Sequence, residues 1–535
     1  MQTYKIRFFL EGEKKPVVTG PIEKYQSNHW TTFLDGWVDQ REENWRPFSS
    51  APMIGVYNIV YWHPKSCRLV VENDLLGQRP LYITVVRGSE VLLSNDFWSV
   101  FCELHRPVVD FGAVEQLCNF RRLAPSWKTL VQQIYRLPAG GRAEISRKIP
   151  EIKIGQVFAM NQNPDMKIDA NLAAEQLNDS IRAIFSRVQR SYRGSEIWFG
   201  NSGGLDSRVI PAYAQSSGVR LKGFVVCERR PRGLLNQSEK SARAIAKSYK
   251  FPHYGIDYKT GSGWERLLRD VAVNPFGPAN FHKNAAFENF SGSLVLTGGN
   301  SFTVANDTNA WLEFAKEADV TEAYVRHNIA RSSFISRDKK SEYIEAVRSQ
   351  LKGSLNNDSA FCVSRSIHQS ILNQTSPAGA FESMNFAGDF QYIYHPYATN
   401  AALHWPEELF YNRRVQLALF KNYFPGLLNI PDQNKAVWKP GGGRNKQSLV
   451  ERLLRRARTN GLAYSRWLNS TWFVRLIDKV EAELSGDESG YAREIFASRA
   501  SFSDVQDQLD MIKLSLIVHR LLNGSPKNED DVFGT

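Results

Sequence analysis

The sequence has little cysteine. Its five cysteines form no C-x-x-C pair and share no regular spacing. This scatter argues against a structural zinc site or a disulfide framework, and it is typical of proteins from a reducing compartment. We interpret the thiols as small buried apolar side chains. They are Cys67, Cys102, Cys118, Cys227 and Cys362.

Long apolar runs are also missing. None approaches the ~20 residues that a membrane helix needs. The first fifteen residues become charged too soon for the apolar core of a signal peptide. The sequence therefore predicts a cytoplasmic protein without membrane insertion.

Acidic residues are fewer than basic ones, 55 against 67, which gives a formal net charge of +12. The densest basic clusters, residues 227–233 and 452–458, have no aromatic interleaving and belong to no known nucleic-acid module. We therefore expect no nucleic-acid binding. An anionic substrate such as ATP, a polyanionic partner and solubility alone stay open as reasons for the charge.

The 535 residues favour two or more domains. Up to about residue 150 the chain has short β-branched or aromatic runs separated by turn residues, which predict a β-rich domain. Periodicity is then lost between 150 and 166. We place the boundary there, between a domain at 1–155 and a second at 167–525. The predicted strands of the first domain are 53–62, 66–74, 80–88 and 89–96.

The second domain alternates amphipathic helices with buried strands and is predicted to be mostly helical beyond about residue 310. Such alternation predicts an α/β fold with a parallel sheet and ligands at the strand ends. The predicted strands are 196–200, 221–227, 252–258 and 293–299. The helices are 169–192, 205–218 and 236–250.

The stretch Ser202-Gly203-Gly204-Leu205-Asp206-Ser207 lies between a predicted strand and a predicted helix. Glycines let backbone N–H groups converge, and a helix N-terminus adds about half a positive charge, so this segment can cradle phosphate. The two serines can donate hydroxyl hydrogen bonds. A carboxylate would repel phosphate, so Asp206 is the predicted ligand of Mg²⁺. The sequence therefore predicts a site for ATP and Mg²⁺.

This stretch resembles the SGGxDS pyrophosphatase loop of the asparagine synthetase family. The resemblance implies that ATP is cleaved between its α and β phosphates, that a carboxylate becomes an acyl-adenylate, and that an amine displaces AMP. Glu72–Ile83, Leu93–Phe101 and Thr129–Ile145 resemble segments of the family's glutaminase domain. The implied fold is an Ntn-hydrolase-like αββα domain followed by an adenine-nucleotide α-hydrolase-like domain.

The N-terminus departs from the family. Glutamine-dependent members need a cysteine at position 2, where this chain has Gln2, and no cysteine lies within the first 60 residues. We therefore expect no glutamine hydrolysis and a first domain retained as scaffold. β-Lactam synthetases and lasso peptide cyclases share this loss and use an amine of the substrate. Free ammonia stays open as the nitrogen source.

A second departure follows the strand at 293–299. The family has a further carboxylate there that helps to hold Mg-pyrophosphate. Thr297 and Gly298 fit the start of that run, and Gly298 is a candidate nucleotide contact. The acid position holds Asn300, Ser301 or Phe302, and Asp307 is the nearest carboxylate. A homologue that binds nucleotide without catalysis therefore stays an alternative.

The segment from Tyr394 to about residue 425 resembles the family's "PFLD" and "K.ilR" region, which implies a basic residue at the pyrophosphate. Arg414, with Arg413 beside it, and Lys421 are the catalytic candidates. We interpret Glu239 as a surface residue and His395 as buried packing.

The predicted substrate is a small-molecule or peptide carboxylate. We favour macrolactam formation on a peptide, as in lasso cyclases, with a precursor peptide and its leader protease as partners. Amidation of a uronic-acid sugar is the alternative within the ligase class. Asparagine synthesis is a further alternative that Gln2 disfavours.

Overall fold

The computed structural model describes residues 3–523 with gaps. The residues outside the description in this span are 12–13, 28, 40–44, 46, 49–52, 87–88, 121, 148, 157–164, 228–236, 258–262, 274, 277–289, 291–292, 300–318, 329–336, 353–359, 371–387, 431–470, 487–488 and 500–504.

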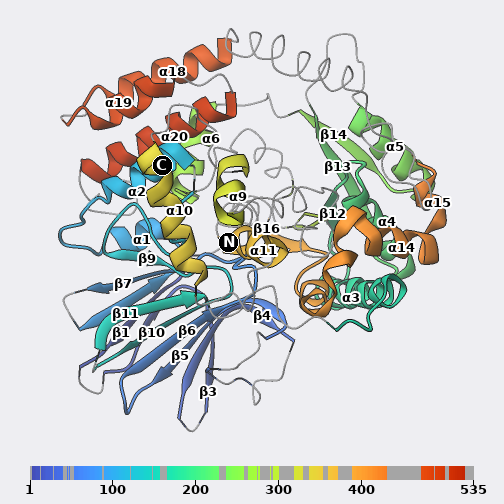
Figure 1. The fold of residues 1–535 in the computed structure, drawn as a ribbon, viewed down its shortest axis with the longest axis horizontal. Coiled ribbons are helices and arrows are strands. Elements are labelled where there is room, and N and C mark those ends of the chain that lie inside the picture. The colour runs from blue at the N-terminus through green and yellow to red at the C-terminus, as the bar shows by residue number, and fades with distance from the viewer. Residues whose placement is uncertain are drawn as a thin grey trace.

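Two antiparallel sheets form the first part of the chain (Figure 1). Their order is β2-β1-β8-β7-β9 and β11-β10-β6-β5-β4-β3. The bounds are β1 Lys5–Phe9, β2 Val17–Thr19, β3 Glu23–Gln26, β4 Thr31–Val38, β5 Gly55–His63, β6 Arg68–Asn73, β7 Tyr82–Val86, β8 Glu90–Ser94, β9 Ile134–Arg136, β10 Gly141–Ser146 and β11 Ile149–Gln156. All four predicted strands are confirmed, but residues 150–156 pair with β10 rather than losing order.

The two sheets share one core, because alternate side chains of their strands point to the same side. In β1, Ile6 and Phe8 are fully buried while their neighbours are half-buried. They pack with Trp62 of β5 and Leu93 of β8, which come from different sheets. The predicted β-rich first part of the chain is therefore confirmed, and its two sheets pack as a sandwich.

A five-stranded parallel sheet follows, in the order β14-β13-β12-β15-β16. The strands are β12 Ile197–Gly200, β13 Leu221–Cys227, β14 His253–Asp257, β15 Ser293–Thr297 and β16 Gly388–Tyr392, with helices α3 Ala170–Ser191, α4 Leu205–Ser216 and α5 Gln237–Tyr249. The order reverses between β12 and β15. Ligands of open α/β sheets bind at such a switch point, at the carboxyl ends of the strands. The α/β class and the parallel sheet are confirmed. The fifth strand, β16, was not predicted and lies in the part of the chain that was expected to be mostly helical.

Helices from distant parts of the chain cover the sandwich on one side (Figure 1). Trp98 of α1 donates from Nε1 to the carbonyl oxygen of Val271 in α6 at 3.1 Å, and Phe120 of α2 stacks on Tyr343 of α10 at 4.1 Å. The helices are α1 Phe97–Phe101, α2 Phe111–Phe120, α6 Gly263–Val273, α9 Val320–Asn328, α10 Arg337–Leu351, α11 Ala360–Ser370, α18 Thr471–Leu484, α19 Tyr491–Ser498 and α20 Val505–Leu522. None of the described helices is long and apolar enough to cross a membrane.

Candidate nucleotide site

The loop between β12 and α4 lies at the carboxyl end of the central strand, beside the switch point. Gly203 has φ +72°, a left-handed conformation that favours glycine. Ser202 Oγ accepts from the backbone N–H of Gly204 and lies 3.2 Å from Ser207 Oγ. Gly204 precedes the helix with no side-chain cap. Amide donors at the start of α4 are therefore left for an anion.

Arg208 is fully buried and binds the loop through hydrogen bonds from its guanidinium. It donates from Nη2 to the carbonyl oxygen of Gly203 at 2.7 Å, and from Nη1 to those of Leu427 and Ile430 at 2.8 and 2.9 Å. The guanidinium thus binds a loop carbonyl on the buried side and links the loop to the end of α15, Pro425–Leu428. This role was not predicted from the sequence, although an arginine directly after the loop is a visible signal.

Asp206 lies in the first turn of α4, and its carboxylate Oδ1 faces residues from α14, Arg414–Tyr423. Arg413 Nη1 donates to Asp206 Oδ1 at 2.5 Å, and Gln416 Nε2 donates to the same atom at 3.0 Å. Arg413 has φ +54° and Asn412 has φ +53°, so two successive residues take the left-handed conformation just before the helix. Such strain at the entry of a helix is a common feature of functional sites.

Tyr394 completes the support of Asp206. Its hydroxyl donates to the backbone oxygen of Asp206 at 3.1 Å and accepts from Gln416 Nε2 at 3.1 Å. Burial and the nearby Asp206 carboxylate raise the pKa of Tyr394 well above its usual value. The hydroxyl therefore keeps its proton as a hydrogen-bond donor at neutral pH.

Gly298 follows β15 and lies directly against the same turn. A Cβ at this position would be 2.2 Å from the backbone oxygen of Asp206 and 2.7 Å from the nitrogen of Ser207. Only glycine fits this approach. The structure thus brings Gly298 together with the loop from which it is separated by about ninety residues of sequence.

The two catalytic candidates lie elsewhere on α14. Arg414 and Lys421 are both exposed, seven positions apart on one face of the helix, and no contact of either with the loop is found among the described residues. The basic residue at Asp206 is Arg413. Asn300, Ser301, Phe302 and Asp307 lie outside the described residues.

Two interpretations of single residues have clear outcomes. Glu239 is not a surface residue: it is 7% exposed and pairs with Arg243 one turn later in α5, at 2.9 Å. The interpretation was wrong because spacing on a helix does not reveal what covers it. The interpretation of His395 as buried is confirmed, since it is 1% exposed.

The residues of the loop fit Mg²⁺ that is bound together with ATP better than a metal ion that is held by protein side chains alone. No group of three or more metal-binding side chains occurs among the described residues. Mg²⁺ is commonly held by one or two carboxylates plus the phosphates of a nucleotide. The Asp206 side chain is 31% exposed, and its Oδ2 accepts none of the hydrogen bonds found in the described part of the chain. One carboxylate oxygen is thus available beside the amide donors.

No protein-family model matches the chain. The chain is 24% identical over 322 residues to "Asparagine synthetase [glutamine-hydrolyzing] 2" of Bacillus subtilis (strain 168), a match that covers 53% of this chain and 41% of that protein. The chain thus spans about two fifths of the length of this curated relative.

Solved structures with likeness to the chain include an NMN synthetase from Francisella tularensis and an NH3-dependent NAD synthetase from Campylobacter jejuni subsp. jejuni NCTC 11168. Both are 12% identical, with TM-scores of 0.18 and 0.19; they cover 50% and 38% of this chain and 99% and 94% of their own. Superpositions at this level add nothing to what the strand order shows. Weak similarity to an asparagine synthetase over half of the chain is therefore the finding that bears on function.

Proposed function

We propose that the chain belongs to the asparagine synthetase family and is an ATP-dependent ligase that activates a carboxylate and joins it to an amine. The observation that supports this most is the loop at the carboxyl end of β12, where free amide donors, two hydroxyls and Asp206 meet at the switch point of a parallel sheet. Similarity to an asparagine synthetase supports the same class of reaction.

The reaction has two steps in this proposal. A carboxylate oxygen of the substrate attacks the α-phosphorus of ATP, the bond to the bridging oxygen breaks, and pyrophosphate leaves. The amine nitrogen then attacks the carbonyl carbon, AMP leaves with the bonding electrons, and the nitrogen gives up a proton. In-line placement of these groups and stabilisation of the charge that develops on the phosphates accelerate the reaction.

The residues of the chain have distinct roles in these steps. Backbone amides at the start of α4 bind phosphate oxygens, with the hydroxyls of Ser202 and Ser207 beside them. Mg²⁺, when bound, neutralises phosphate charge, and Asp206 is its ligand. Gly298 lets β15 approach the loop and borders the nucleotide.

We assign pyrophosphate binding to Arg413 in place of Arg414. Its guanidinium lies at Asp206 and can bind two phosphate oxygens at once. Lys421 stays a prediction as a second cation. It is exposed seven residues along α14.

The ligase is proposed to act without glutamine hydrolysis. Among the described residues, the strand β1 begins at Lys5 and the nearest cysteine in sequence is Cys67, in a turn between β5 and β6. Tyr4 fills the buried space before β1, where burial and the Asp35 carboxylate raise the pKa of its hydroxyl. A thiol nucleophile at this end of the strand is therefore not part of the proposal.

The finer proposal is that the carboxylate belongs to a peptide that is closed into a macrolactam. The net charge of +12 supports an anionic or acidic substrate. A uronic-acid sugar is the alternative. Release of pyrophosphate from ATP, measured with a panel of acidic peptides and a panel of uronic acids, separates the two.

The deciding experiment measures binding of a non-hydrolysable ATP analogue with Mg²⁺ by isothermal titration calorimetry, for the wild type and Asp206→Asn. If the chain is a ligase, we expect the wild type to bind the analogue in a Mg-dependent manner, and we expect the variant to lose this binding. We also expect the wild type to release pyrophosphate from ATP only when a carboxylate substrate is present. Binding without any pyrophosphate release would instead support the non-catalytic homologue. No nucleotide binding by the wild type would overturn both.

A further inference from the structure

A buried contact joins the N-terminal sandwich to the segment that supports the loop. Asp74 lies in the turn after β6 and is fully buried. Its Oδ1 accepts from the backbone N–H of Leu76 at 3.0 Å, and its Oδ2 from that of Gln78 at 3.2 Å. The N–H of Tyr57 in β5 approaches Oδ2 at 3.4 Å. The carboxylate is thus fixed to the sandwich by three backbone groups.

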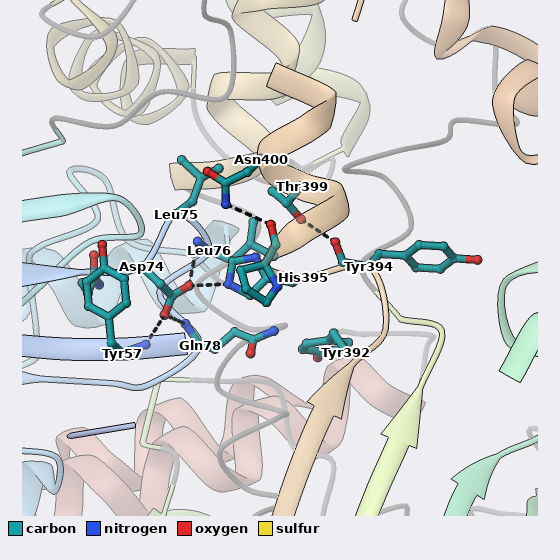
Figure 2. Close-up of polar contacts among 12 residues, drawn as sticks. Tyr57, Asp74, Leu75, Leu76, Gln78, Tyr392, Tyr394, His395, Thr399 and Asn400 are labelled. Carbon is teal, nitrogen blue, oxygen red and sulfur yellow. Dashed lines mark hydrogen bonds and ion pairs between the residues drawn. The ribbon is translucent and has the colours of Figure 1, made fainter. Parts of the chain in front are cut away.

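His395 meets this carboxylate from the other part of the molecule. Its Nε2 lies 2.9 Å from Asp74 Oδ1, an ion-pair contact when the imidazole is protonated. Figure 2 shows that the side chains of His395 and Tyr394 point in opposite directions, the first toward Asp74 and the second away from it.

Hydrogen bonds fix the backbone at Tyr394 and His395. Thr399 donates to the carbonyl oxygen of Tyr394 from both its backbone nitrogen and its hydroxyl, each at 2.9 Å. Gln391 Nε2 donates to the carbonyl oxygen of His395 at 2.7 Å. A shift of His395 would therefore shift Tyr394 with it.

Tyr394 carries the connection to the loop, because its hydroxyl binds the backbone oxygen of Asp206 and the amide of Gln416. Every side chain from Asp74 through His395 to Tyr394 is at most 1% exposed. Electrostatic contacts in such a dry environment are stronger than in water. They form an unbroken chain of contacts from the sandwich to the first turn of α4.

We propose that Asp74 is a positioning residue for the nucleotide loop: through His395 and Tyr394, the N-terminal sandwich sets the position of Asp206. This gives the sandwich a task that needs no thiol nucleophile. The identity of the ligand that the loop binds rests on the proposed function, whereas the contacts that connect Asp74 to Asp206 do not.

Substitutions of His395 test the connection, because Asp74 also holds its own turn together. His395→Phe keeps an aromatic ring but removes the donor that faces Asp74. His395→Gln keeps an N–H donor. Gln350→Ala is the matched control: Gln350 Nε2 donates to Ser126 Oγ at 2.7 Å, which joins α10 to the segment between α2 and β9 rather than to the segment with Tyr394.

Hydrogen–deuterium exchange of the nucleotide-free protein gives the first readout, in peptides that cover residues 203–210. We expect His395→Phe to speed exchange there by at least about fivefold, the lower end of typical coupling between sites. His395→Gln restores most of the protection, and Gln350→Ala leaves these peptides unchanged. Equal exchange in all variants, or faster exchange in Gln350→Ala as well, would overturn the proposal.

Binding of the Mg-ATP analogue gives the second readout, at a temperature where all variants are folded by circular dichroism. Affinity in His395→Phe falls by a similar factor and recovers in His395→Gln. Unchanged affinity beside a changed exchange rate would refute a role in ligand binding. A wild type that binds no nucleotide would refute the proposed function alone, since the exchange experiment decides the connection by itself.

Discussion

Asp206 Oδ1 and Arg413 Nη1 lie 2.5 Å apart, although 207 positions separate them in the chain. The contact joins the first turn of α4 to the start of α14 and neutralises the carboxylate that is proposed to bind Mg²⁺. The Arg413 guanidinium therefore lies where it can exchange the carboxylate for phosphate oxygens as its hydrogen-bond partners when Mg²⁺ binds Asp206.

Arg413→Met lowers the rate of pyrophosphate release, because it removes a cation from the position of the leaving group. A loss of roughly 10²–10³-fold is typical when one such group is removed. Arg414→Met is the matched control and stays within about twofold, as is usual for an exposed side chain away from a site. Steady-state kinetics with saturating ATP checks both. A larger loss in Arg414→Met would return the role to that residue.

Arg413→Met has little effect on stability. The Asp206 side chain is 31% exposed and can be hydrated once its partner is gone, so the ion pair contributes at most about 1 kcal/mol. Urea denaturation of the variant measures this. A large loss of stability would mean that the contact is structural rather than functional.

Gly298→Ala destabilises the protein and displaces the loop, because the new methyl group would lie 2.2 Å from the backbone oxygen of Asp206. Overpacking of this kind costs about 1–3 kcal/mol. Gly426→Ala serves as control, since nothing lies within 4 Å of a Cβ there. Gly426 lies in α15, so alanine stabilises by up to about 1 kcal/mol. If thermal unfolding gave a change in stability of the same sign for both variants, the close approach of β15 to the loop would be contradicted.

Arg208→Met weakens both the fold and nucleotide binding. The carbonyl groups of Gly203, Leu427 and Ile430 lose their donor in a buried place, at about 1–3 kcal/mol for each group left unpaired. Arg208→Lys restores only part, because an ammonium cannot reach all three. Denaturant unfolding and calorimetric titration with the Mg-ATP analogue check the effects. Wild-type affinity in a folded Arg208→Met variant would show that the clamp does not shape the loop.

Alkaline pH destabilises the protein in part through Tyr82, which lies in the core beside Phe97 and Phe276. Burial raises its pKa to about 12, with Arg136 opposing the shift. The unfolded chain loses this proton near pH 10 and the folded protein keeps it, so stability falls as pH rises between about 10 and 12. Two pKa units correspond to roughly 3 kcal/mol.

Tyr82→Phe removes this part of the pH dependence. The variant therefore loses less stability than the wild type between pH 9 and pH 12, measured by urea denaturation at each pH. Parallel curves of stability against pH for the two proteins would show that the Tyr82 hydroxyl ionises as readily in the folded protein as in the unfolded chain.

Four of the five strands of the parallel sheet could be predicted, because each is a short apolar run beside amphipathic helices. Strand β16 was missed, because Gly388–Tyr392 mixes polar and aromatic residues. The loop from Ser202 to Ser207 could be predicted because its chemistry is local: glycines, hydroxyls and a carboxylate stand side by side in the sequence. Strands such as β4 and β9 were missed, because Thr31–Val38 mixes polar and apolar residues and Ile134–Arg136 has only three residues. Their order comes from pairing with distant neighbours.

Contacts between distant segments lay beyond sequence reasoning. The family pattern pointed to a basic residue near position 414, but the backbone at Asn412 and Arg413 turns the guanidinium of Arg413, and not that of Arg414, toward Asp206. A one-residue change on a helix rotates a side chain by about 100°, so position alone cannot choose between neighbours. Similarly, Glu239 is covered by elements that its own helix does not reveal.

The sequence alone determined the α/β class, the β-rich first part and the position of the glycine-rich loop between β12 and α4, because each rests on local periodicity or on neighbouring residues. Only the tertiary structure decided which cation faces Asp206, why Gly298 must be glycine, and that Asp74 lies against His395. Those relationships depend on how the chain returns to itself across hundreds of residues, and they are fixed by packing rather than by any local pattern.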